Sequence, residues 1–293
     1  MNENMGMHGH LDAVKISRPH KARSFRVPGL GRVIVTRDPG VSTRLADEYF
    51  QTHLTAVWRD GDHKIKDVID LGSGTVTNVG VLSMANDFAW ASPSGAAINT
   101  LKLQNYHAVG TGTNPSTAYQ VALQTLAAPT TTTAITGAQS LVSAASVQIY
   151  QTVATTNFTG SAAITEWGLF NAATLSATTG SPFTAGTATT GTVTGTPLTA
   201  SSTTVQGQQQ FIFQDNTAAS PFWGLVTSNT TSQVTVPAWY KVADGSLSGV
   251  NPVNADAYTI LPVMFDRQQF SAINVINGDS IQWTFQLTIQ SGG

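Results

Sequence analysis

The sequence predicts a mainly β fold: an antiparallel, jelly-roll-like β-sandwich with an extended N-terminal arm, one helix and an inserted β subdomain. Three observations lead to this prediction. From Lys64 onward, apolar and β-branched residues alternate with polar ones in many short runs. Clusters of Thr, Gly, Asn and Pro separate these runs. Charged residues make up only 10% of the chain and hydrophobic residues 41%, a balance that favours folding over disorder.

We interpret the first part of the chain as an extended basic arm. Residues 1–44 carry eight basic side chains against three acidic ones, and Pro19, Pro28 and Pro39 favour extended backbone. A short strand is expected at residues 31–36. The basic side chains are the candidate assembly contacts: Lys15, Arg18, Lys21, Arg23, Arg26, Arg32, Arg37 and Arg44.

One amphipathic helix is expected near residues 43–58. Ser42 or Thr43 could cap it, and a turn at residues 59–62 would end it. Its apolar stripe has near-helical spacing and comprises Leu45, Tyr49, Leu54, Val57 and Trp58. Arm and helix together form the first predicted unit, residues 1–65.

Short strands are expected after this unit, among them residues 75–81, 101–109, 143–154, 209–213, 233–236 and 279–289. The last strand places five apolar side chains on one face, and we expect Trp283 to be buried there: Ile281, Trp283, Phe285, Leu287 and Ile289. Asn277 and Gly278 precede it, a pair typical of a tight turn, which predicts a hairpin with residues 273–276.

Two further units complete the predicted organisation. Residues 66–175 and 262–293 form the sandwich. Residues 176–261 form the inserted subdomain, which begins in an uncharged Thr/Ala/Gly/Ser tract and continues into aromatic pairs. The aromatic residues of this insertion are candidate ligand or partner contacts: Phe222, Trp223, Trp239 and Tyr240.

The sequence offers little acid–base chemistry, and we expect no enzymatic activity and no cofactor. Glu166 is the only charged residue between Lys102 and Asp215. General acid–base catalysis commonly uses two groups with separated pKa values, whereas a lone carboxylate in a strand is usually a hydrogen-bonded structural group. Residues 110–113, Gly-Thr-Gly-Thr, lack the lysine of a phosphate-binding loop.

We expect no metal site either. His8 and His10 could bind a soft metal ion, but a solvated terminus explains them more simply. Asp60, Asp62 and Asp67 depart from the spacing of a calcium-binding loop and fit a turn that ends the helix.

Charge is distributed unevenly along the chain. Residues 1–66 hold 11 basic and 7 acidic side chains, a net charge of +4, whereas the remainder holds 3 and 9, a net charge of −6. The basic arm could bind an acidic protein surface or nucleic acid. Phe25 is its only aromatic residue before residue 44, so base stacking has little support and a protein partner is favoured.

No secretory signal or membrane-spanning run is expected from the sequence. The N-terminal ten residues have no apolar stretch, and no apolar run approaches the length that a membrane helix needs. The prediction is therefore a protein made in a cytoplasm and without a membrane partner.

Several segments together resemble a broad group of tailed-phage virion proteins: capsid-decorating, head-fibre and tail-fibre-like proteins. They cover roughly residues 66–175 and 262–293. The segments are Thr-Val-Thr-Asn-Val-Gly-Val at 75–81, Asn-Asp-Phe-Ala-Trp at 86–90, the Gly-Thr-Gly-Thr run at 110–113, Thr-Glu-Trp-Gly-Leu-Phe at 165–170 and Ile-Asn-Val-Ile-Asn-Gly-Asp-Ser-Ile-Gln at 273–282. The insertion at 176–261 departs from the shortest members of the group, and its role stays open.

The resemblance implies a structural subunit of a virion, assembled in the bacterial host cytoplasm. The first expectation is a capsid decoration or cement protein, a homo-oligomer with a trimer favoured, bound to the major capsid protein. A neck, tail or fibre adaptor bound to other virion proteins is the second. A host-receptor or glycan-binding module, with exposed aromatic residues of the insertion as contacts, is the third.

Overall fold

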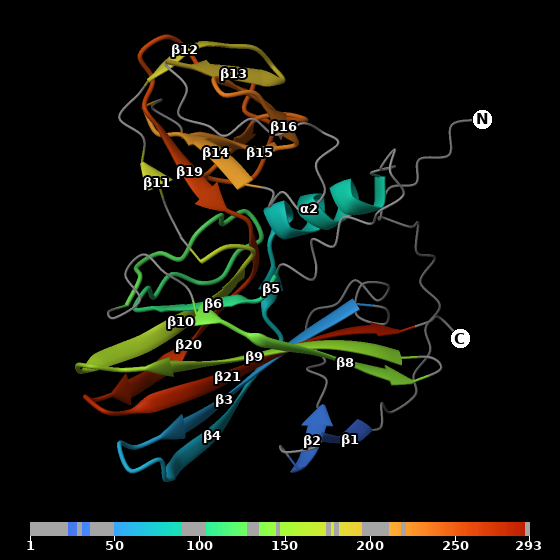
Figure 1. Ribbon diagram of the computed structural model, residues 1–293, viewed down its shortest axis with the longest axis vertical. Coiled ribbons are helices and arrows are strands. Elements are labelled where there is room, and N and C mark those ends of the chain that lie inside the picture. The colour runs from blue at the N-terminus through green and yellow to red at the C-terminus, as the bar shows by residue number, and fades with distance from the viewer. Residues whose placement is uncertain are drawn as a thin grey trace.

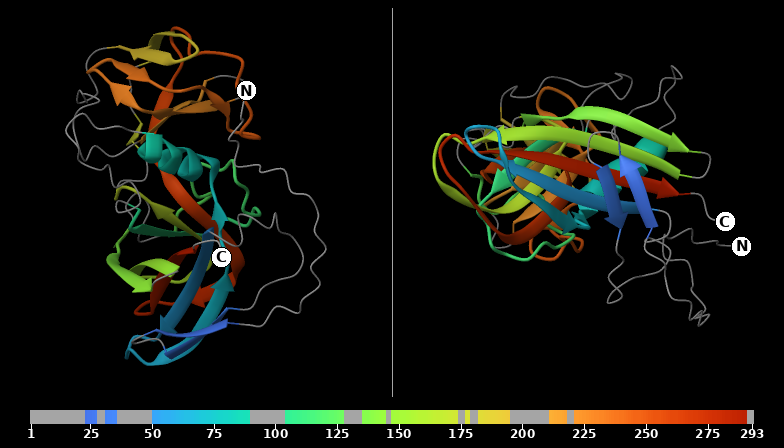
Figure 2. Two further views of the ribbon diagram at one scale, coloured as in Figure 1. Left: turned by 90° about the vertical axis from the view of Figure 1, so that its right-hand side faces the viewer. Right: turned by 90° about the horizontal axis from the view of Figure 1, so that it is seen from below.

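The computed structural model describes residues 23–27, 31–35, 50–89, 104–127, 135–144, 147–173, 177–178, 182–194, 211–217 and 221–290 (Figure 1). Over these residues the protein is mainly β, with several antiparallel sheets and one helix, as the sequence predicts for the fold class. The molecule is elongated. A sandwich of two sheets lies at one end, and two further sheets lie at the other (Figures 1 and 2).

The first sheet of the sandwich has the strand order β4-β3-β21-β9-β8. Its central strand, β21 (Ser280–Gln290), pairs along its length with β3 (Phe50–Arg59) on one side and with β9 (Val147–Asn157) on the other. Its two edge strands are β4 (Ile65–Gly72) and β8 (Ala138–Ala144).

The second sheet has the order β5-β20-β10-β6-β7, again with antiparallel neighbours. Its strands are β5 (Thr75–Val76), β20 (Met264–Val275), β10 (Ala162–Phe170), β6 (Tyr106–Gly110) and β7 (Ile135–Thr136). β10 is buried throughout its second half, because it lies in the middle of the sheet and its residues from Ile164 to Phe170 have no exposed face.

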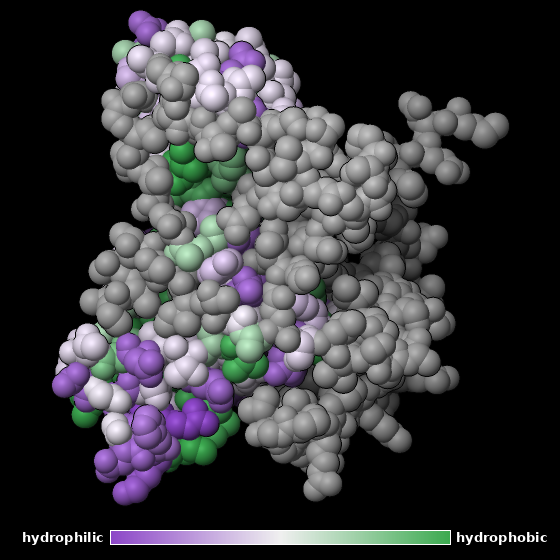
Figure 3. All heavy atoms as spheres, in the orientation of Figure 1, coloured by the Kyte–Doolittle hydropathy of each residue, from purple (hydrophilic) through white to green (hydrophobic). Residues whose placement is uncertain are grey.

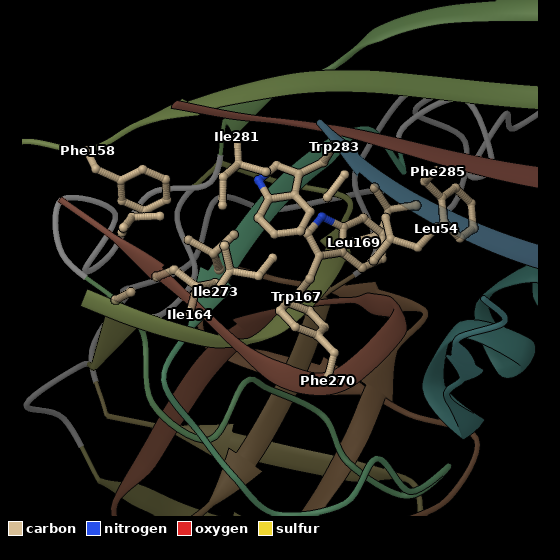
Figure 4. Packing of buried hydrophobic residues seen from close by; sticks show 14 of the residues in the cluster. Leu54, Phe158, Ile164, Trp167, Leu169, Phe270, Ile273, Ile281, Trp283 and Phe285 are labelled. Carbon is tan, nitrogen blue, oxygen red and sulfur yellow. The ribbon is translucent and has the colours of Figure 1, made fainter. Parts of the chain in front are cut away.

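The two sheets pack face to face over one apolar core (Figure 4). Trp167 of β10 stacks on Phe285 of β21 with 5.6 Å between ring centroids, and Phe270 of β20 lies 5.9 Å from Trp283 of β21. Each pair joins one sheet to the other. The Trp283 indole N–H also donates to Thr156 Oγ1 at 3.1 Å, so its polar atom is satisfied inside the core.

The predicted apolar face of the closing strand is confirmed over four residues. Ile281, Trp283, Phe285 and Leu287 are all 0–1% exposed. The side chain of the fifth, Ile289, lies outside those that the structure describes.

The other end of the molecule consists of a five-stranded sheet, β11-β19-β14-β15-β18, and a four-stranded sheet, β12-β13-β17-β16. Their strands are β11 (Ala177–Thr178), β12 (Phe183–Gly186), β13 (Thr190–Val193), β14 (Phe211–Asp215), β15 (Phe222–Val226), β16 (Ser228–Asn229), β17 (Gln233–Thr235), β18 (Tyr240–Lys241) and β19 (Tyr258–Pro262). Phe183, Phe213 and Tyr258 pack ring against ring between these sheets.

Helix α2 (Asn78–Ala89) lies between the two ends (Figures 1 and 2). Thr77 caps it: its Oγ1 accepts the N–H of Gly80 at 3.0 Å. Gly80 allows the helix to dock on β20, because a Cβ there would lie 2.7 Å from the Phe265 carbonyl oxygen. Val79 joins a second core cluster with Trp223 and Val263, so the helix ties the two ends of the molecule together.

The helix predicted near residues 43–58 is wrong over residues 50–58, which form strand β3. Thr52, Leu54 and Ala56 alternate with more exposed residues, and their buried side faces the sandwich core. Leu54 and Trp58, two residues of the apolar stripe that suggested a helix, also share one face of this strand, and the ten-residue ladder to β21 favours the strand. Residues 43–49 lie outside the described residues.

A second correction concerns residues 75–81, which the sequence predicts as one strand. Only Thr75 and Val76 are in a strand, β5, and α2 begins at Asn78. The cap formed by Thr77 turns the chain from one structure to the other.

A third correction concerns the closing hairpin. Asn277 and Gly278 do form a tight turn, with Gly278 at φ 89°, but β20 and β21 belong to different sheets and do not pair. The turn instead hydrogen-bonds to Phe158, whose N–H donates to the Asp279 carbonyl and whose carbonyl accepts from Gly278. Because its backbone groups are satisfied there, the turn can carry the chain from one layer of the sandwich to the other.

β1 (Arg23–Val27) and β2 (Gly31–Val35) form a separate two-stranded antiparallel sheet. β2 falls where the sequence predicts a short strand. The predicted unit boundaries, 1–65, 66–175 with 262–293, and 176–261, stay predictions; β3 lies N-terminal of residue 66 and belongs to a sandwich sheet.

Candidate assembly interface

An open groove of about 520 Å³ lies along one side of the sandwich. The first sheet contributes one wall and the second sheet the other, so the groove runs between the two layers. The lining residues are Trp58, Asp67, Ile69, Asp70 and Leu71 from β3 and β4, and Gln269, Phe270, Ser271, Ala272 and Ile273 from β20.

Both walls of the groove are sheet edges. β4 pairs with β3 on one side and is the edge of its sheet. β5 covers β20 only at Asp266 and Arg267, so the edge of β20 beyond these residues has no neighbouring strand among the described residues. The side chain of Gln268 donates to the carbonyl of Leu71 and joins the two walls at one end of the groove.

The floor of the groove is apolar. Trp58, Ile69 and Leu71 are partly buried and pack against the sandwich core, to which Phe270 and Ile273 themselves belong. The groove is therefore a place where the core reaches the surface, rather than a cavity with its own separate lining. A partner that covered it would extend the core, which is the main source of stability in protein–protein contacts.

Asp279 fixes the Trp58 side of this groove. Its Oδ2 accepts the Trp58 indole N–H at 2.9 Å, the Lys66 ammonium at 3.1 Å and the Ile276 N–H at 3.1 Å. Burial alone would raise the pKa of Asp279, but the hydrogen bonds from Ile276 and Trp58 and the Lys66 ammonium outweigh it and lower the pKa. Lys66 Nζ also lies 3.9 Å from the centre of the Trp58 ring.

β4 also carries exposed apolar side chains that do not line the groove. Ile65 is 59% exposed and Val68 is 61% exposed, both unusual values for large apolar residues in a strand. In Figure 3 apolar and charged surface lie side by side at the end of the molecule where Figure 1 draws β3 and β4. This strand is thus an exposed edge of the kind that natural proteins usually protect.

Glu166, the lone carboxylate noted in the sequence, is a structural group. It is fully buried and forms an ion pair with Arg267 of β20, with 2.6 Å between Oε2 and Nη2 and 3.0 Å between Oε2 and Nε. It also accepts three backbone N–H groups, from Gly112, Gln124 and Thr125, at 2.8–3.1 Å. Every oxygen is occupied, as a buried carboxylate requires.

The two glycines of the Gly-Thr-Gly-Thr run at residues 110–113 are required by their close approach to the Glu166 carboxylate. A Cβ on Gly110 or Gly112 would overlap Glu166 Oε1, so only glycine lets the backbone approach it. On the other side, Arg267 Nη1 donates to Gln120 Oε1 at 2.8 Å and to the Asn114 carbonyl at 3.2 Å. The ion pair therefore holds the loop of residues 111–126 against β10 and β20.

His107 is a second buried titratable group. Burial lowers its pKa from 6.5 to about 3, so the ring is neutral near neutral pH. Its Nδ1 accepts the Trp167 indole N–H at 3.2 Å. Nε2 must then carry the proton, and it donates to Thr152 Oγ1 at 3.1 Å.

Asp266 is the third buried titratable group. Burial raises its pKa from 3.8 to about 7, against a smaller opposing effect of the Thr52 hydroxyl. It lies on β20 beside Gly74, where a Cβ would overlap the carboxyl group. The carboxyl group is therefore fully buried against the backbone at Gly74.

The candidate metal ligands are not brought together. Asp60 Oδ1 accepts the N–H groups of Asp62 and Lys64 and stabilises the turn between β3 and β4, rather than a turn at the end of a helix. Within the part of the chain that the structure describes, no group of three or more His, Cys, Asp or Glu side chains could hold a metal ion. His8 and His10 lie outside that part.

The candidate contacts of the arm are only partly placed. Arg23, Arg26 and Arg32 lie in β1 and β2, of which the backbone alone is described. The others lie outside the described residues: Lys15, Arg18, Lys21, Arg37 and Arg44.

The aromatic candidates of the insertion are core residues. Phe222, Trp223 and Trp239 are 1–3% exposed, and Tyr240 is half-buried against Trp223 with 4.9 Å between ring centroids. The exposure on which a role in glycan contact was based is therefore absent from three of the four residues, and these side chains stabilise the insertion.

Sequence reasoning missed the groove, because its walls come from strands that are about two hundred residues apart in the chain. The unusual sequence of β4, Ile-Lys-Asp-Val-Ile-Asp, in which apolar and charged residues do not alternate strictly, was the one available signal.

Comparisons with protein-family models, with curated proteins and with solved structures found no match to this chain. Among the described residues, no helix has the length and apolar character needed to span a membrane.

Proposed function

We propose that this chain is a structural, non-enzymatic subunit of a tailed-phage virion, with a jelly-roll-like sandwich, that acts as a capsid decoration or cement protein. It would stabilise the shell by contacts between subunits and with the major capsid protein. The observation that carries the proposal is the groove between β4 and β20, where the apolar core reaches the surface between two open sheet edges. Such a surface suits a permanent protein partner.

Composition supports the same proposal. A chain with 10% charged residues has little charge to keep a free monomer soluble, whereas a subunit covered by neighbours needs less. The chemistry of the buried groups adds support, because Glu166 and His107 are each engaged in holding strands and loops together.

The alternative is a neck, tail or fibre adaptor of the same particle, which the open edges would suit equally. Copy number separates the two. Quantitative mass spectrometry of purified particles should give a copy number comparable with that of the shell protein for a decoration protein, and one set by the tail vertex for an adaptor. Absence of the chain from purified particles would refute both.

A receptor- or glycan-binding role is the weakest of the three, since Phe222, Trp223 and Trp239 are buried. For the basic arm we propose a protein partner rather than nucleic acid. Tight, salt-sensitive binding of DNA by the chain would reverse that choice.

A further inference from the structure

We propose that the groove between β4 and β20 binds residues 13–18 of a second copy of this chain as an added β-strand. The inference rests on the proposed function, because it names the partner that this groove takes when the subunit assembles. Four features support it: the two open edges, the apolar floor, the charge of the groove and the pattern of residues 13–18.

The open edges select an extended occupant. An unpaired edge strand presents a row of N–H and C=O groups to whatever lies beside it, and an extended segment satisfies them by main-chain hydrogen bonds. Here the unpaired stretch of β20 and the edge strand β4 line the same groove. One added strand would therefore cover the side on which the sandwich is open.

The apolar floor of the groove favours an occupant with apolar side chains on one face. Residues 13–18 read Ala-Val-Lys-Ile-Ser-Arg, so Val14 and Ile16 fall on one face of an extended segment. Facing inward, they would cover the apolar floor around Ile69 and Phe270. Pro19 follows directly and would end the added strand, because proline has no N–H to donate.

Charge favours the basic arm as the occupant. The groove lining contains two carboxylates, Asp67 and Asp70, and no basic residue; beside it, His53 contacts Asp70, and Lys66 is paired with Asp279. Residues 13–37 contain seven basic residues and no acidic one, and Lys15 and Arg18 lie within the proposed strand. The basic leader carries a net charge of +4 and the rest of the chain −6, so leader and body attract each other, and between two copies this attraction gives a head-to-tail contact. Such a head-to-tail contact can close into a ring.

The chain has no cysteine, so single cysteines can report this contact in the full-length protein. One sample mixes chains carrying Ser17→Cys with chains carrying Ser271→Cys, on the exposed edge of β20, and adds a short bis-maleimide cross-linker. The control replaces the second chain by one with Ser140→Cys, exposed on β8, the other edge of the first sheet. Each chain has one thiol, so a product joining the two variants can only arise between copies.

We expect the Ser17–Ser271 product in several-fold excess over the Ser17–Ser140 product. Equal yields, or no product at the highest soluble concentration, would overturn the proposal. A chain with both Ser17→Cys and Ser271→Cys that cross-links only within itself would place the strand in its own groove, and would also overturn it.

A charge exchange then tests the identity of the segment. In the Ser271→Cys chain, Asp67→Arg with Asp70→Arg should abolish the excess. Adding Lys15→Asp with Arg18→Asp to the Ser17→Cys chain should restore it. Adding acidic substitutions at Arg37 and Arg44 of that chain instead should not restore it. A yield unaffected by these changes would refute residues 13–18 as the occupant. All of these readouts use the purified chain alone. The groove proposal can therefore fail while the chain is still found in particles, and it can hold while the chain is absent from them.

Discussion

Glu166 and Arg267 form a fully buried ion pair that joins two neighbouring strands of one sheet to the loop packed beside them. Both side chains are 0% exposed, and Glu166 Oε2 accepts from Nη2 and Nε of the same guanidinium. The carboxylate binds backbone N–H groups of the loop, and the guanidinium binds its carbonyl groups. Loss of one partner leaves the other charge buried without compensation.

Removing one member of this pair should therefore destabilise the chain strongly. For Glu166→Ala or Arg267→Ala we expect a loss of about 3–5 kcal/mol in the free energy of unfolding, measured by urea denaturation. The double variant should lose less than the sum of the two. Asp62→Ala, which removes an exposed ion pair with Lys64, is the control and should change nothing measurable. Single variants as stable as the control would show that the pair is not structural.

Gly112 should not tolerate a side chain. Gly112→Ala places a Cβ against Glu166 Oε1, and we expect a loss of about 1–3 kcal/mol as the loop shifts away from the carboxylate. Gly160→Ala is the matched control, because nothing lies within 4 Å of a Cβ there. Equal thermal midpoints for the two variants would mean that the loop can move without cost.

Trp283→Ala should destabilise the sandwich rather than alter one contact. The indole is fully buried between the sheets, and truncating a large buried aromatic residue costs about 3–5 kcal/mol. Against a total of about 5–15 kcal/mol, the variant should melt much earlier or aggregate. Ile276→Ala, at a side chain that is 55% exposed, serves as the control. Unchanged melting together with weaker assembly would make Trp283 a subunit contact instead.

Stability should fall as pH rises toward 7, because of Asp266. Its pKa is about 7 in the folded chain and 3.8 in the unfolded chain, so between these values folding takes up a proton. The stabilisation is fully present below the unfolded pKa and is lost as pH rises through the folded one. Asp266→Asn, which cannot ionise, should flatten this part of the profile of unfolding free energy against pH. A profile that kept its full slope in Asp266→Asn would contradict this prediction.

Deleting residues 1–44 should leave a folded, soluble body that no longer binds its particle. The deleted residues precede β3, the first strand of the sandwich, and hold eight basic residues but little apolar surface. Circular dichroism would check folding, and co-sedimentation with particles would check binding. Retained binding would show that the arm is not the clamp.

The parts of the fold that follow from local pattern could be predicted, and those that depend on distant partners could not. The alternation from Ile281 to Leu287 was enough to predict burial of Trp283, because such regular alternation of apolar and polar residues indicates a strand with one buried face. The spacing of apolar residues over residues 50–58 did not distinguish a helix from a strand, and their partner β21 lies more than two hundred residues away.

The candidate sites divide in the same way. That Glu166 would be structural could be expected from its isolation in the sequence, but its partner Arg267 is 101 residues further on. The turn at Asn277 and Gly278 was recognisable, whereas its role as a bridge between layers depended on Phe158. Long-range pairing of this kind leaves no trace in a local window of sequence.

β21 is the central strand of its sheet and the last of the described strands to leave the ribosome. Until it emerges, β3 and β9 have no strand between them, and the Trp167 side of the core is uncovered. Folding of the sandwich must then wait until β21 has been synthesised, and the edges of β3 and β9 stay exposed to other chains until then. Yield in a host cell would depend on how quickly translation of β21 follows that of β3 and β9, and on chaperones that shield these two strands in the meantime.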